Sequence, residues 1–401
     1  MASSSSSPIV SGRRLSLVDA LRGFALLAIV ILHNMEHYNL YFTPEGMPEW
    51  LQWLDKTVID MVWFLFAGNA YATFSLLFGF SFYIQMRNAR KRGCDFRVRF
   101  AWRMVLLMGF AMLHSLFYNG DILMLYAVCG LLLIPASALS NRTLIILSGI
   151  LMLQPFAWGK IIYACINPDY VDTNSMFLPF AQAAEQVGMH GNIAETFMSN
   201  IRDGILYSNL WQIEAGRLSL TPALFMTGMV LGRCELFVKS DRSRRFWRRV
   251  LMWSFVAAIP LYLLKELVPP YLTNITVISY YGIAVPRIYN VATMLILVSV
   301  FVLAWFHAGE GYKFQRSVIA YGRMSLTNYI TQSIMGVAIY YNCGLGLYDR
   351  TGGMACLIIA MGIFFIQLAW SRRWLATHKQ GPLEYVWKRL TWYTPGVVQK
   401  A

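Results

Sequence analysis

The chain has 401 residues, of which 57% are hydrophobic and only 13% are charged, about half the charged fraction of an average soluble domain. This composition excludes a soluble globular protein, because the apolar residues form runs of about 20 residues, long enough to cross a hydrocarbon core. The net charge of +14 does not indicate a nucleic-acid-binding protein, since the basic residues are concentrated between these runs.

The apolar runs predict an all-α integral membrane protein, because every backbone amide in lipid must be satisfied within its own segment. The runs do not alternate in hydropathy as the strands of a barrel would. Ten transmembrane helices are expected, in chain order at 17–36, 58–86, 100–118, 121–139, 143–165, 218–237, 250–267, 278–306, 317–341 and 353–370. The second and eighth are long enough to be tilted or broken, or to protrude.

These spans form one transmembrane domain over residues 17–375. A serine-rich N-terminal tail at 1–16 is expected to be disordered, and residues 376–401 are expected to form a C-terminal tail. With ten spans, the two termini and the loops after the even-numbered spans share one side, which holds 23 of the 34 Lys and Arg residues. The positive-inside rule makes this side cytoplasmic, so both termini are predicted to lie inside.

The largest loop on the opposite side spans residues 167–217. Its apolar residues recur at helical spacing among acidic ones, which predicts amphipathic helices on the outer face. Such helices would form a packing cap over the bundle or a lid over a substrate cavity. The six cysteines lack metal-ligand spacing, so neither a metal site nor a disulfide framework is expected. The sequence also has no usable hydrolase, zincin, Walker A or dinucleotide-binding motif.

The first span carries Asp19, Arg22 and His33, and ionisable groups inside a span are functional candidates because they are costly to bury. Ten residues separate Arg22 from His33, about 16 Å along a helix, so they are expected in the inner and outer halves of the membrane. Asp19 can pair with Arg22. His33 is interpreted either as interhelical packing glue or as a general base, with Asn34 beside it as a substrate-binding candidate.

The third span carries His114, and the fourth opens at Asp121. A carboxylate at this position can cap the helix and interact favourably with its dipole. The alternative is that Asp121 orients His114 or His33 for catalysis. His114 is equally compatible with core hydrogen bonding and with a catalytic or substrate-binding role.

The segment 87–103 is strongly basic. It fits the positive-inside signal with contact to anionic lipid, or a docking site for a nucleotide-bearing acyl donor in which Arg97, Arg99 and Arg103 bind phosphates.

Four further polar residues complete the candidate site. The ninth span opens with a polar cluster that includes Arg323 and Asn328 and is expected to line a cavity or hold helices together. Glu214 stands where the outer insertion enters the sixth span, and Arg287 follows Pro286 in the eighth. Arg323 is a further candidate for donor binding, and the other three are candidates for substrate binding.

The chain resembles the YeiB-like family of bacterial membrane proteins over nearly its whole length. The matching stretches are DALRG at 19–23, FSLLFGF at 74–80, HSLFYNGDILMLYA at 114–127, GRMSLTNY at 322–329 and GPLEYVWK at 381–388, and the C-terminal YeiB-type region covers about 218–390. That family is similar to the wider transmembrane acyltransferase superfamily, which includes the acyltransferase-3 proteins and heparan-glucosaminide N-acetyltransferase. Acyltransferase-3 members carry an Arg and a His in their first span at the spacing of Arg22 and His33.

The resemblance implies a multi-pass acyltransferase of the bacterial cytoplasmic membrane. It would move an acyl group, chiefly acetyl, from cytoplasmic acyl-CoA to an acceptor at the membrane or outside, with His33 as general base and Arg22 supporting the site. Acyl-CoA would be the co-substrate, without a metal. The other expected partners are membrane lipids and a second copy in a homodimer, and nucleic acid is not expected.

Two other classes of function stay open on the residues alone. In a transporter for a small solute or lipid, Arg22, His33 and His114 would form a polar pathway. In a structural or sensory protein, the same histidines would be fully hydrogen-bonded and would hold neighbouring helices together.

Overall fold

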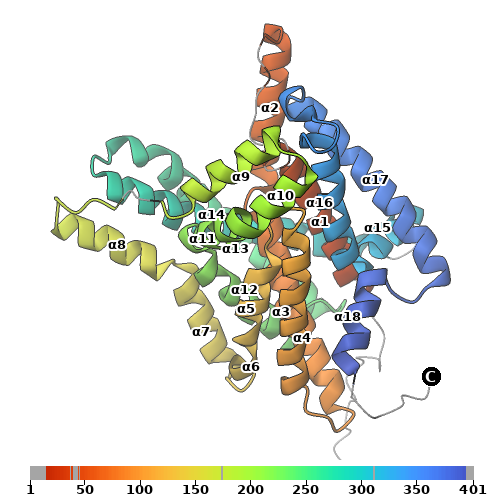
Figure 1. The fold of residues 1–401 in the computed structure, drawn as a ribbon. Helices are drawn as coiled ribbons and strands as arrows, with labels where there is room; N and C mark the ends of the chain where they lie inside the picture. Colours follow the sequence, from red (N-terminus) through yellow and green to blue (C-terminus); the bar gives the residue numbers. More distant parts are fainter. Residues whose placement is uncertain are drawn as a thin grey trace, which may run out of the picture.

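The computed structural model describes residues 15–36, 38, 44, 46–172, 175–309 and 312–393, and within these ranges it is helical and contains no strand, as expected. Residues 1–14, most of the predicted N-terminal tail, lie outside the described residues. The helices of the chain are α1 (Ser16–Glu36), α2 (Glu49–Phe66), α3 (Asn69–Arg90), α4 (Arg97–Ser115), α5 (Leu123–Leu131), α6 (Leu133–Ala136), α7 (Asn141–Met152), α8 (Pro155–Ile166), α9 (Leu178–His190), α10 (Ile193–Ser199), α11 (Ile205–Glu214), α12 (Arg217–Arg233), α13 (Asp241–Leu267), α14 (Ile275–Ala308), α15 (Lys313–Arg323), α16 (Ser325–Tyr340), α17 (Gly353–Thr377) and α18 (Pro382–Trp392). Figure 1 shows their arrangement.

Among the described residues, five helical segments are long and apolar enough to cross a membrane. They are α1, α2 with α3, α13 with the turn that follows it, α14 and α17. A sixth appears if α7 and α8, bent by 45° at their junction, are counted as one crossing. These segments indicate a multi-pass membrane protein. The expected number of about ten spans is not confirmed, because several predicted spans are divided into shorter helices.

The second predicted span breaks between α2 and α3 at Gly68. Gly68 adopts a left-handed backbone conformation with φ of 75°, which favours glycine because it has no Cβ. A Cβ at this position would also lie 2.0 Å from Nδ2 of Asn290. α2 therefore leaves the bundle at this break and projects beyond it (Figure 1).

The ninth predicted span is divided into α15 and α16 at Met324. The Glu384 carboxylate of α18 accepts hydrogen bonds from the Leu326 amide at 2.8 Å, the Thr327 amide at 3.1 Å and the Thr327 hydroxyl at 2.6 Å. A carboxylate in this position satisfies free amides and faces the positive end of the helix dipole. The C-terminal segment predicted as a tail thus contains a helix that caps α16.

The outer insertion is helical, as predicted, and consists of α9, α10, a π-helical turn at Asn200–Gly204 and α11. In Figure 1 it lies over the upper ends of the central helices. The Asn200 side-chain amide donates to the Leu116 carbonyl at 3.0 Å, and the Asn342 amide donates to the Gly188 carbonyl at 3.0 Å. The insertion is therefore fixed both to the end of α4 and to the end of α16.

The centre of the bundle depends on close helix crossings. A Cβ on Gly79 of α3 would lie 1.8 Å from the Phe225 carbonyl oxygen of α12, and one on Gly228 would lie 1.8 Å from the Leu76 carbonyl oxygen. α1 crosses α15 in the same way, since a Cβ on Gly322 would lie 1.9 Å from the Asp19 carbonyl oxygen. Backbones can approach this closely only where no side chain separates them.

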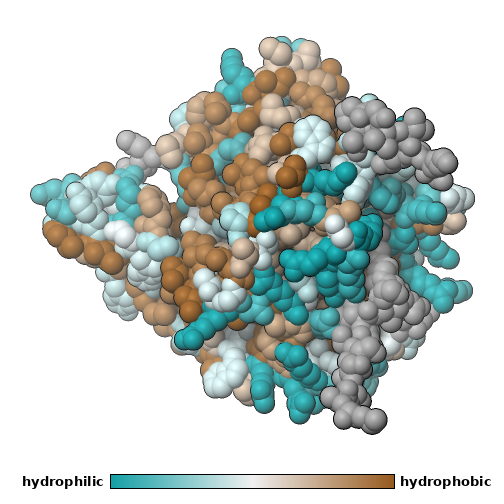
Figure 2. Space-filling model, turned by 90° about the horizontal axis from the view of Figure 1, so that it is seen from below, coloured by the Kyte–Doolittle hydropathy of each residue, from teal (hydrophilic) through white to brown (hydrophobic). Residues whose placement is uncertain are grey.

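Hydrophilic side chains gather at one end of the bundle. The first turn of α1, the last turn of α3 and α18 lie toward the lower end in Figure 1. Figure 2 shows this end from below, with hydrophilic side chains gathered across the middle of the face. Three of the segments that the sequence places on the basic side therefore lie toward the same end.

Candidate active site

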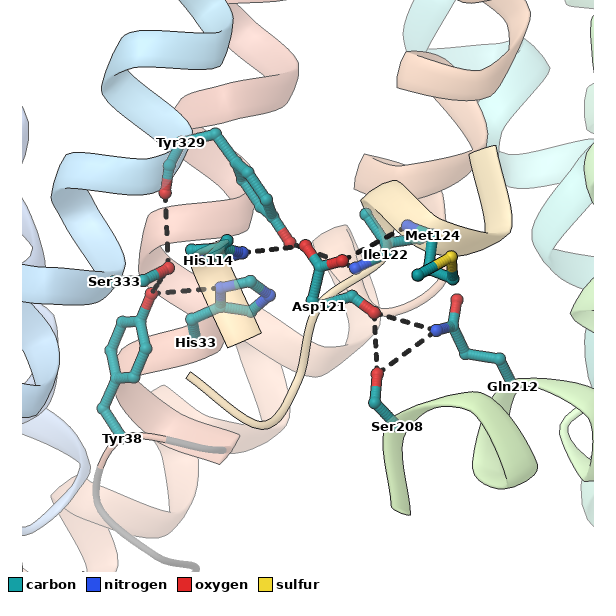
Figure 3. Close-up of polar contacts among 10 residues, drawn as sticks. All are labelled: His33, Tyr38, His114, Asp121, Ile122, Met124, Ser208, Gln212, Tyr329 and Ser333. Carbon is teal, nitrogen blue, oxygen red and sulfur yellow. Dashed lines mark hydrogen bonds and ion pairs between the residues drawn. The ribbon is translucent and has the colours of Figure 1, made fainter. Parts of the chain in front are cut away.

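A buried histidine and a buried aspartate meet near the end of the central helices that contacts α11 (Figure 3). His114 comes from the last turn of α4, and Asp121 from the turn that leads into α5. His114 Nδ1 lies 2.8 Å from Asp121 Oδ1, and the two side chains are 0% and 2% exposed. Asp121 Oδ2 accepts the Met124 amide at 3.2 Å. Asp121 therefore accepts a backbone amide at the start of α5 and contacts His114 at the same time.

The outer insertion holds this aspartate in place. The Asp121 carbonyl oxygen accepts hydrogen bonds from the Ser208 hydroxyl at 2.7 Å and from Nε2 of Gln212 at 2.9 Å. Both donors are buried residues of α11. The insertion thus fixes the backbone that carries the His114 partner, in addition to covering it.

The second nitrogen of His114 is available for chemistry. A carboxylate accepts hydrogen bonds, so the neutral tautomer that carries its proton on Nδ1 would donate to Asp121 and keep Nε2 as an acceptor. Nε2 is buried and has no hydrogen-bond partner among the described residues. An imidazole oriented by a carboxylate, with its opposite nitrogen open, is the arrangement of a general base.

His33 shares the surroundings of His114. Its Nδ1 lies 3.3 Å from the Tyr38 hydroxyl, which in turn donates to the Ser333 hydroxyl at 3.0 Å. The Tyr118 ring lies 5.3 Å from the His33 ring and 5.6 Å from the His114 ring, and the corresponding distances from Tyr329 are 6.2 and 5.0 Å. The two histidines therefore contact the same pair of tyrosines.

A cavity of about 700 Å³ extends from the lower end of the bundle toward these tyrosines. It is lined along the first span from Leu15, just before α1, to Ile29, a length of about 21 Å at the rise of an α-helix. The basic side chains in its wall are Arg22, Arg87, Arg103, Arg323 and Lys388. The aromatic side chains in its wall include Phe74, Phe78, Phe80, Phe82 and Phe100.

Tyr329 forms the boundary between the cavity and the histidines. Its side chain is part of the cavity wall, and its ring contacts both imidazoles. The hydroxyl of Tyr329 accepts the Ile122 amide at 3.4 Å, next to Asp121. Neither His33 nor His114 lines the cavity itself, and the Tyr329 ring lies both in the cavity wall and against the His114 ring.

Two of the basic residues at the lower end are neutralised by carboxylates. Arg22 pairs with Asp19 at 2.7 Å, as predicted, and also donates to the Ser81 hydroxyl. Arg87 pairs with Glu235 at 3.3 Å. These pairs shape the lower end but add little net charge to it.

Arg103 and Lys388 contribute positive charge to the lower end. The Arg103 guanidinium lies 3.7 Å from the centre of the Trp387 ring, and Lys388 is exposed. Glu384, the nearby acid of the cavity wall, is engaged by the amides and hydroxyl at the start of α16. In the described part of the chain, neither Arg103 nor Lys388 forms an ion pair.

The five arginines predicted to hold an acyl donor fall into two groups. Arg22, Arg103 and Arg323 line the cavity. Arg97 does not, because it is exposed and pairs with Asp95 at 2.8 Å, and its hydrogen bond lowers the pKa of that carboxyl. Arg99 also lies outside the cavity wall, with its guanidinium 4.4 Å from the Trp392 ring centre.

Asn34 and Asn328 are buried within helix contacts and do not line the cavity. The Asn34 side-chain amide donates to the Val30 carbonyl at 2.7 Å. The Asn328 amide donates to the Tyr321 carbonyl at 3.0 Å and to the Ser371 hydroxyl at 2.9 Å. Asn328 therefore joins α15, α16 and α17.

Glu214 and Arg287 also lie apart from the cavity wall. Glu214 accepts the Ser175 hydroxyl at 2.8 Å and the Met176 amide at 2.7 Å, so it fixes the start of the outer insertion. Nε of Arg287 donates to the Ala215 carbonyl at 2.8 Å. The structure does not bring these two residues into the site of His33 and His114.

The sequence reasoning missed the tyrosines of the site. Tyr118 and Tyr329 lie within the stretches at 114–127 and 322–329 that resemble the YeiB-like family, so this resemblance could have marked them as candidates. Tyr38 follows the predicted end of the first span, and Ser333 lies inside an apolar span, so nothing marked either of them before the fold was known.

The fold and this site define a class of protein, a multi-pass helical membrane protein with a large internal cavity. The cavity has basic side chains at one end and a histidine–aspartate pair beyond the other end. Residues 231–394 match the family described as "Protein of unknown function (DUF418)". The chain is 25% identical to the uncharacterized protein YxaH of Bacillus subtilis, with 97% of each chain covered. It is also 25% identical to the uncharacterized protein YeiB of Escherichia coli, covering 93% of this chain and 95% of that one.

A third relative is the uncharacterized 39.9 kDa protein in the amylase 3' region of Bacillus acidopullulyticus, at 25% identity over 96% of each chain. The expected resemblance to the YeiB-like family is therefore confirmed over nearly the whole chain. No solved structure matches the chain.

Proposed function

We propose that the chain is a membrane-bound acyltransferase that moves an acyl group, such as acetyl, from cytoplasmic acyl-CoA to an acceptor at the membrane or its outer side. The observation that supports this function best is the cavity that leads from basic residues at one end to Tyr329 at the other, beside the His114–Asp121 pair. With the lower end on the cytoplasmic side, acyl-CoA would reach the site from the side of the membrane where it is found in a cell.

The cavity wall matches the chemistry of an acyl-CoA along its length. Arg103 and Lys388 offer cationic donors without a carboxylate partner at the lower end, where the phosphates of the donor would bind. The phenylalanine-rich middle suits the long pantetheine arm, since ligand pockets are mostly apolar with a few polar groups that fix orientation. The thioester would then lie against Tyr329.

In the proposed reaction, Nε2 of His114 removes a proton from a hydroxyl or amine of the acceptor, which attacks the thioester carbonyl. The carbon–sulfur bond breaks, and the CoA thiolate takes the proton back from the imidazolium. Asp121 stabilises the charged imidazole through the 2.8 Å contact to Nδ1. An intermediate acyl-histidine is the other route open to this site.

The geometry favours His114 over His33 as the base, although the spacing of Arg22 and His33 pointed to His33. His114 has the carboxylate partner, whereas Nδ1 of His33 faces a tyrosine hydroxyl. His33 still contacts the same two tyrosine rings, so we assign it to the acceptor side of the reaction. Parallel substitution of the two histidines separates these roles.

We further propose ten crossings of a bacterial cytoplasmic membrane with both termini inside, since the division of 23 inner and four outer Lys and Arg residues supports it. With the six native cysteines replaced by alanine, Arg350→Cys should react with a membrane-impermeant maleimide on intact cells. Arg242→Cys should react only after permeabilisation. The reverse pattern would contradict the orientation, and labelling of both would contradict the count.

Replacing Arg103 with Gln should weaken acetyl-CoA binding about tenfold, a change of about 1.4 kcal/mol, because one charge-assisted contact to a phosphate is lost. Isothermal titration calorimetry on the purified protein measures this. Arg97→Gln is the matched control, since Arg97 is an exposed arginine of the same helix outside the cavity, and it should bind acetyl-CoA as the unaltered chain does.

Failure of the unaltered chain to bind acetyl-CoA would overturn the proposed class of function. The transporter alternative makes a different prediction, namely flux of a small solute into reconstituted vesicles without any acyl donor. Flux together with an absence of acetyl-CoA binding would replace the acyltransferase proposal by that alternative.

A further inference from the structure

A second cluster of charged and polar groups lies near the outer end of the bundle, apart from the histidine site. Arg217 opens α12, and its guanidinium lies 4.4 Å from the ring centre of Tyr71 and 4.3 Å from that of Trp211. Contacts of this kind between a guanidinium and aromatic faces are favourable and hold the cation in place. The position of Arg217 is therefore set by α3 on one side and α11 on the other.

Arg287 of α14 belongs to the same cluster. Its Nε donates to the carbonyl of Ala215, in the turn that joins α11 to α12. The Tyr71 hydroxyl and the Glu36 carboxylate both lie within electrostatic range of Arg217 and Arg287. Four helices thus bring two cations, one carboxylate and one phenol together, with one positive charge in excess.

Several donors of this cluster lack acceptors. Among the described residues, neither Arg217 nor Arg287 forms an ion pair, and Nε of Arg217 is buried without a hydrogen-bond partner. The Tyr71 side chain is 7% exposed, and its hydroxyl also lacks a partner. A buried donor without an acceptor is destabilising, so the cluster as it stands is unfavourable unless a ligand completes it.

A buried amide extends the cluster. Gln154 is 2% exposed, and its Nε2 has no partner in the described chain. Its side chain lies against Gly216, the residue before Arg217, because a Cβ on that glycine would lie 2.3 Å from Oε1 of Gln154. Arginine, phenol and amide groups together form a set of hydrogen-bond donors with excess positive charge, which is the complement of an oxyanion.

We propose that Arg217, Arg287, Tyr71 and Gln154 form a binding site for an oxyanion, a carboxylate or a phosphate group, near the outer end of the bundle. Tyr71 is also part of the wall of the large cavity, and Glu36 follows His33 by one turn of α1. The site therefore adjoins the histidines. The assignment of the anion to the acyl acceptor rests on the proposed acyl transfer. The anion site itself does not rest on that proposal.

The test measures anion binding directly. The full-length protein in phosphatidylcholine nanodiscs is titrated with inorganic phosphate and with acetate. The unaltered chain should show saturable binding of at least one probe, and Arg217→Gln and Arg287→Gln should weaken it tenfold or more. Arg202→Gln is the matched control, because Arg202 is an outer-face arginine that is 79% exposed and pairs with Asp203, and it should change nothing.

A second arm separates a lipid headgroup from a soluble anion. In nanodiscs that contain phosphatidylglycerol, native mass spectrometry should show that lipid retained by the unaltered chain and lost from the Arg217 and Arg287 variants if the phosphate comes from lipid. If the source is soluble, phosphatidylglycerol should neither be retained nor compete with the phosphate or acetate probe.

Tyr71→Phe keeps the volume of the side chain and removes only the hydroxyl, so it tests the site even if an arginine variant fails to fold. It should weaken anion binding three- to tenfold. The inference is overturned if the unaltered chain binds neither probe and retains no phosphatidylglycerol, or if Tyr71→Phe and the folded arginine variants bind as the unaltered chain does.

The outcomes for this site and for the proposed function are distinguishable. Acetyl-CoA binding is measured on the same samples, and Arg103 and Lys388 lie at the opposite end of the cavity. Anion binding without acetyl-CoA binding would leave the site standing and remove the acyltransferase proposal. Acetyl-CoA binding without anion binding would remove the site alone.

Discussion

Replacing His114 with Ala, or Asp121 with Asn, should lower the release of CoA thiol from acetyl-CoA by about 10²- to 10⁴-fold, the usual contribution of a general base. The aspartate variant should fail because its amide no longer stabilises a charged imidazole or fixes the proton on Nδ1. Both variants should still bind acetyl-CoA, since neither side chain lines the cavity. Thiol release by the purified protein, together with calorimetric binding, measures the two effects separately.

His378→Ala is the control for this prediction, because His378 is an exposed histidine stacked 4.1 Å from the ring of Trp374 at the end of α17. It should turn over acetyl-CoA normally. His33→Ala is measured in parallel. Normal turnover in His114→Ala would contradict the assignment, and selective loss in His33→Ala would return the role of base to the residue that the sequence favoured.

A single methyl group at Gly228 should strongly destabilise the protein and lower its thermal midpoint. A Cβ there would lie 1.8 Å from the Leu76 carbonyl oxygen and 2.9 Å from the Phe80 amide nitrogen. Both are backbone atoms of a helix, so relief requires α3 and α12 to separate. Overpacking usually costs about 1–3 kcal/mol and occasionally more, and we expect Gly228→Ala at or above the upper end, against a total stability of about 5–15 kcal/mol.

The yield of monodisperse protein and its thermal midpoint in detergent test this prediction. Gly109→Ala is the matched control, because a Cβ at that exposed position of α4 meets no atom within 4 Å. Alanine is also favoured over glycine in a helix by about 1 kcal/mol, so the control should melt at or slightly above the temperature of the unaltered chain. If Gly228→Ala melts like Gly109→Ala, the close crossing of α3 and α12 is wrong.

The positions of long apolar helices could be predicted from hydropathy, and α1, α13, α14 and α17 lie close to their expected ranges. The breaks that divide some of the predicted spans could not be predicted from hydropathy. Gly68 ends α2 in the company of Asn290, more than 200 residues further along the chain, and α16 is capped by Glu384 of another helix. Such breaks depend on contacts that hydropathy does not record, which is why the second and ninth predicted spans each contain more than one helix.

Part of the candidate site could likewise be predicted from the sequence, and part could not. His114 and Asp121 are seven residues apart across one turn, so their contact could be anticipated from local geometry. Tyr329, which separates them from the cavity, approaches from a helix some 200 residues away. The basic character of segment 87–103 was readable, but only the fold shows that Arg103 faces the cavity while Arg97 points to solvent.

The most direct measurement of the central claim is a cryo-electron microscopy structure of the protein with a thioether analogue of acetyl-CoA. The proposed function predicts density along the cavity, with the phosphates near Arg103 and Lys388 and the acetyl group against Tyr329, next to His114. An empty cavity at a saturating concentration of the analogue, or an analogue bound with its acetyl group away from Tyr329, would contradict it.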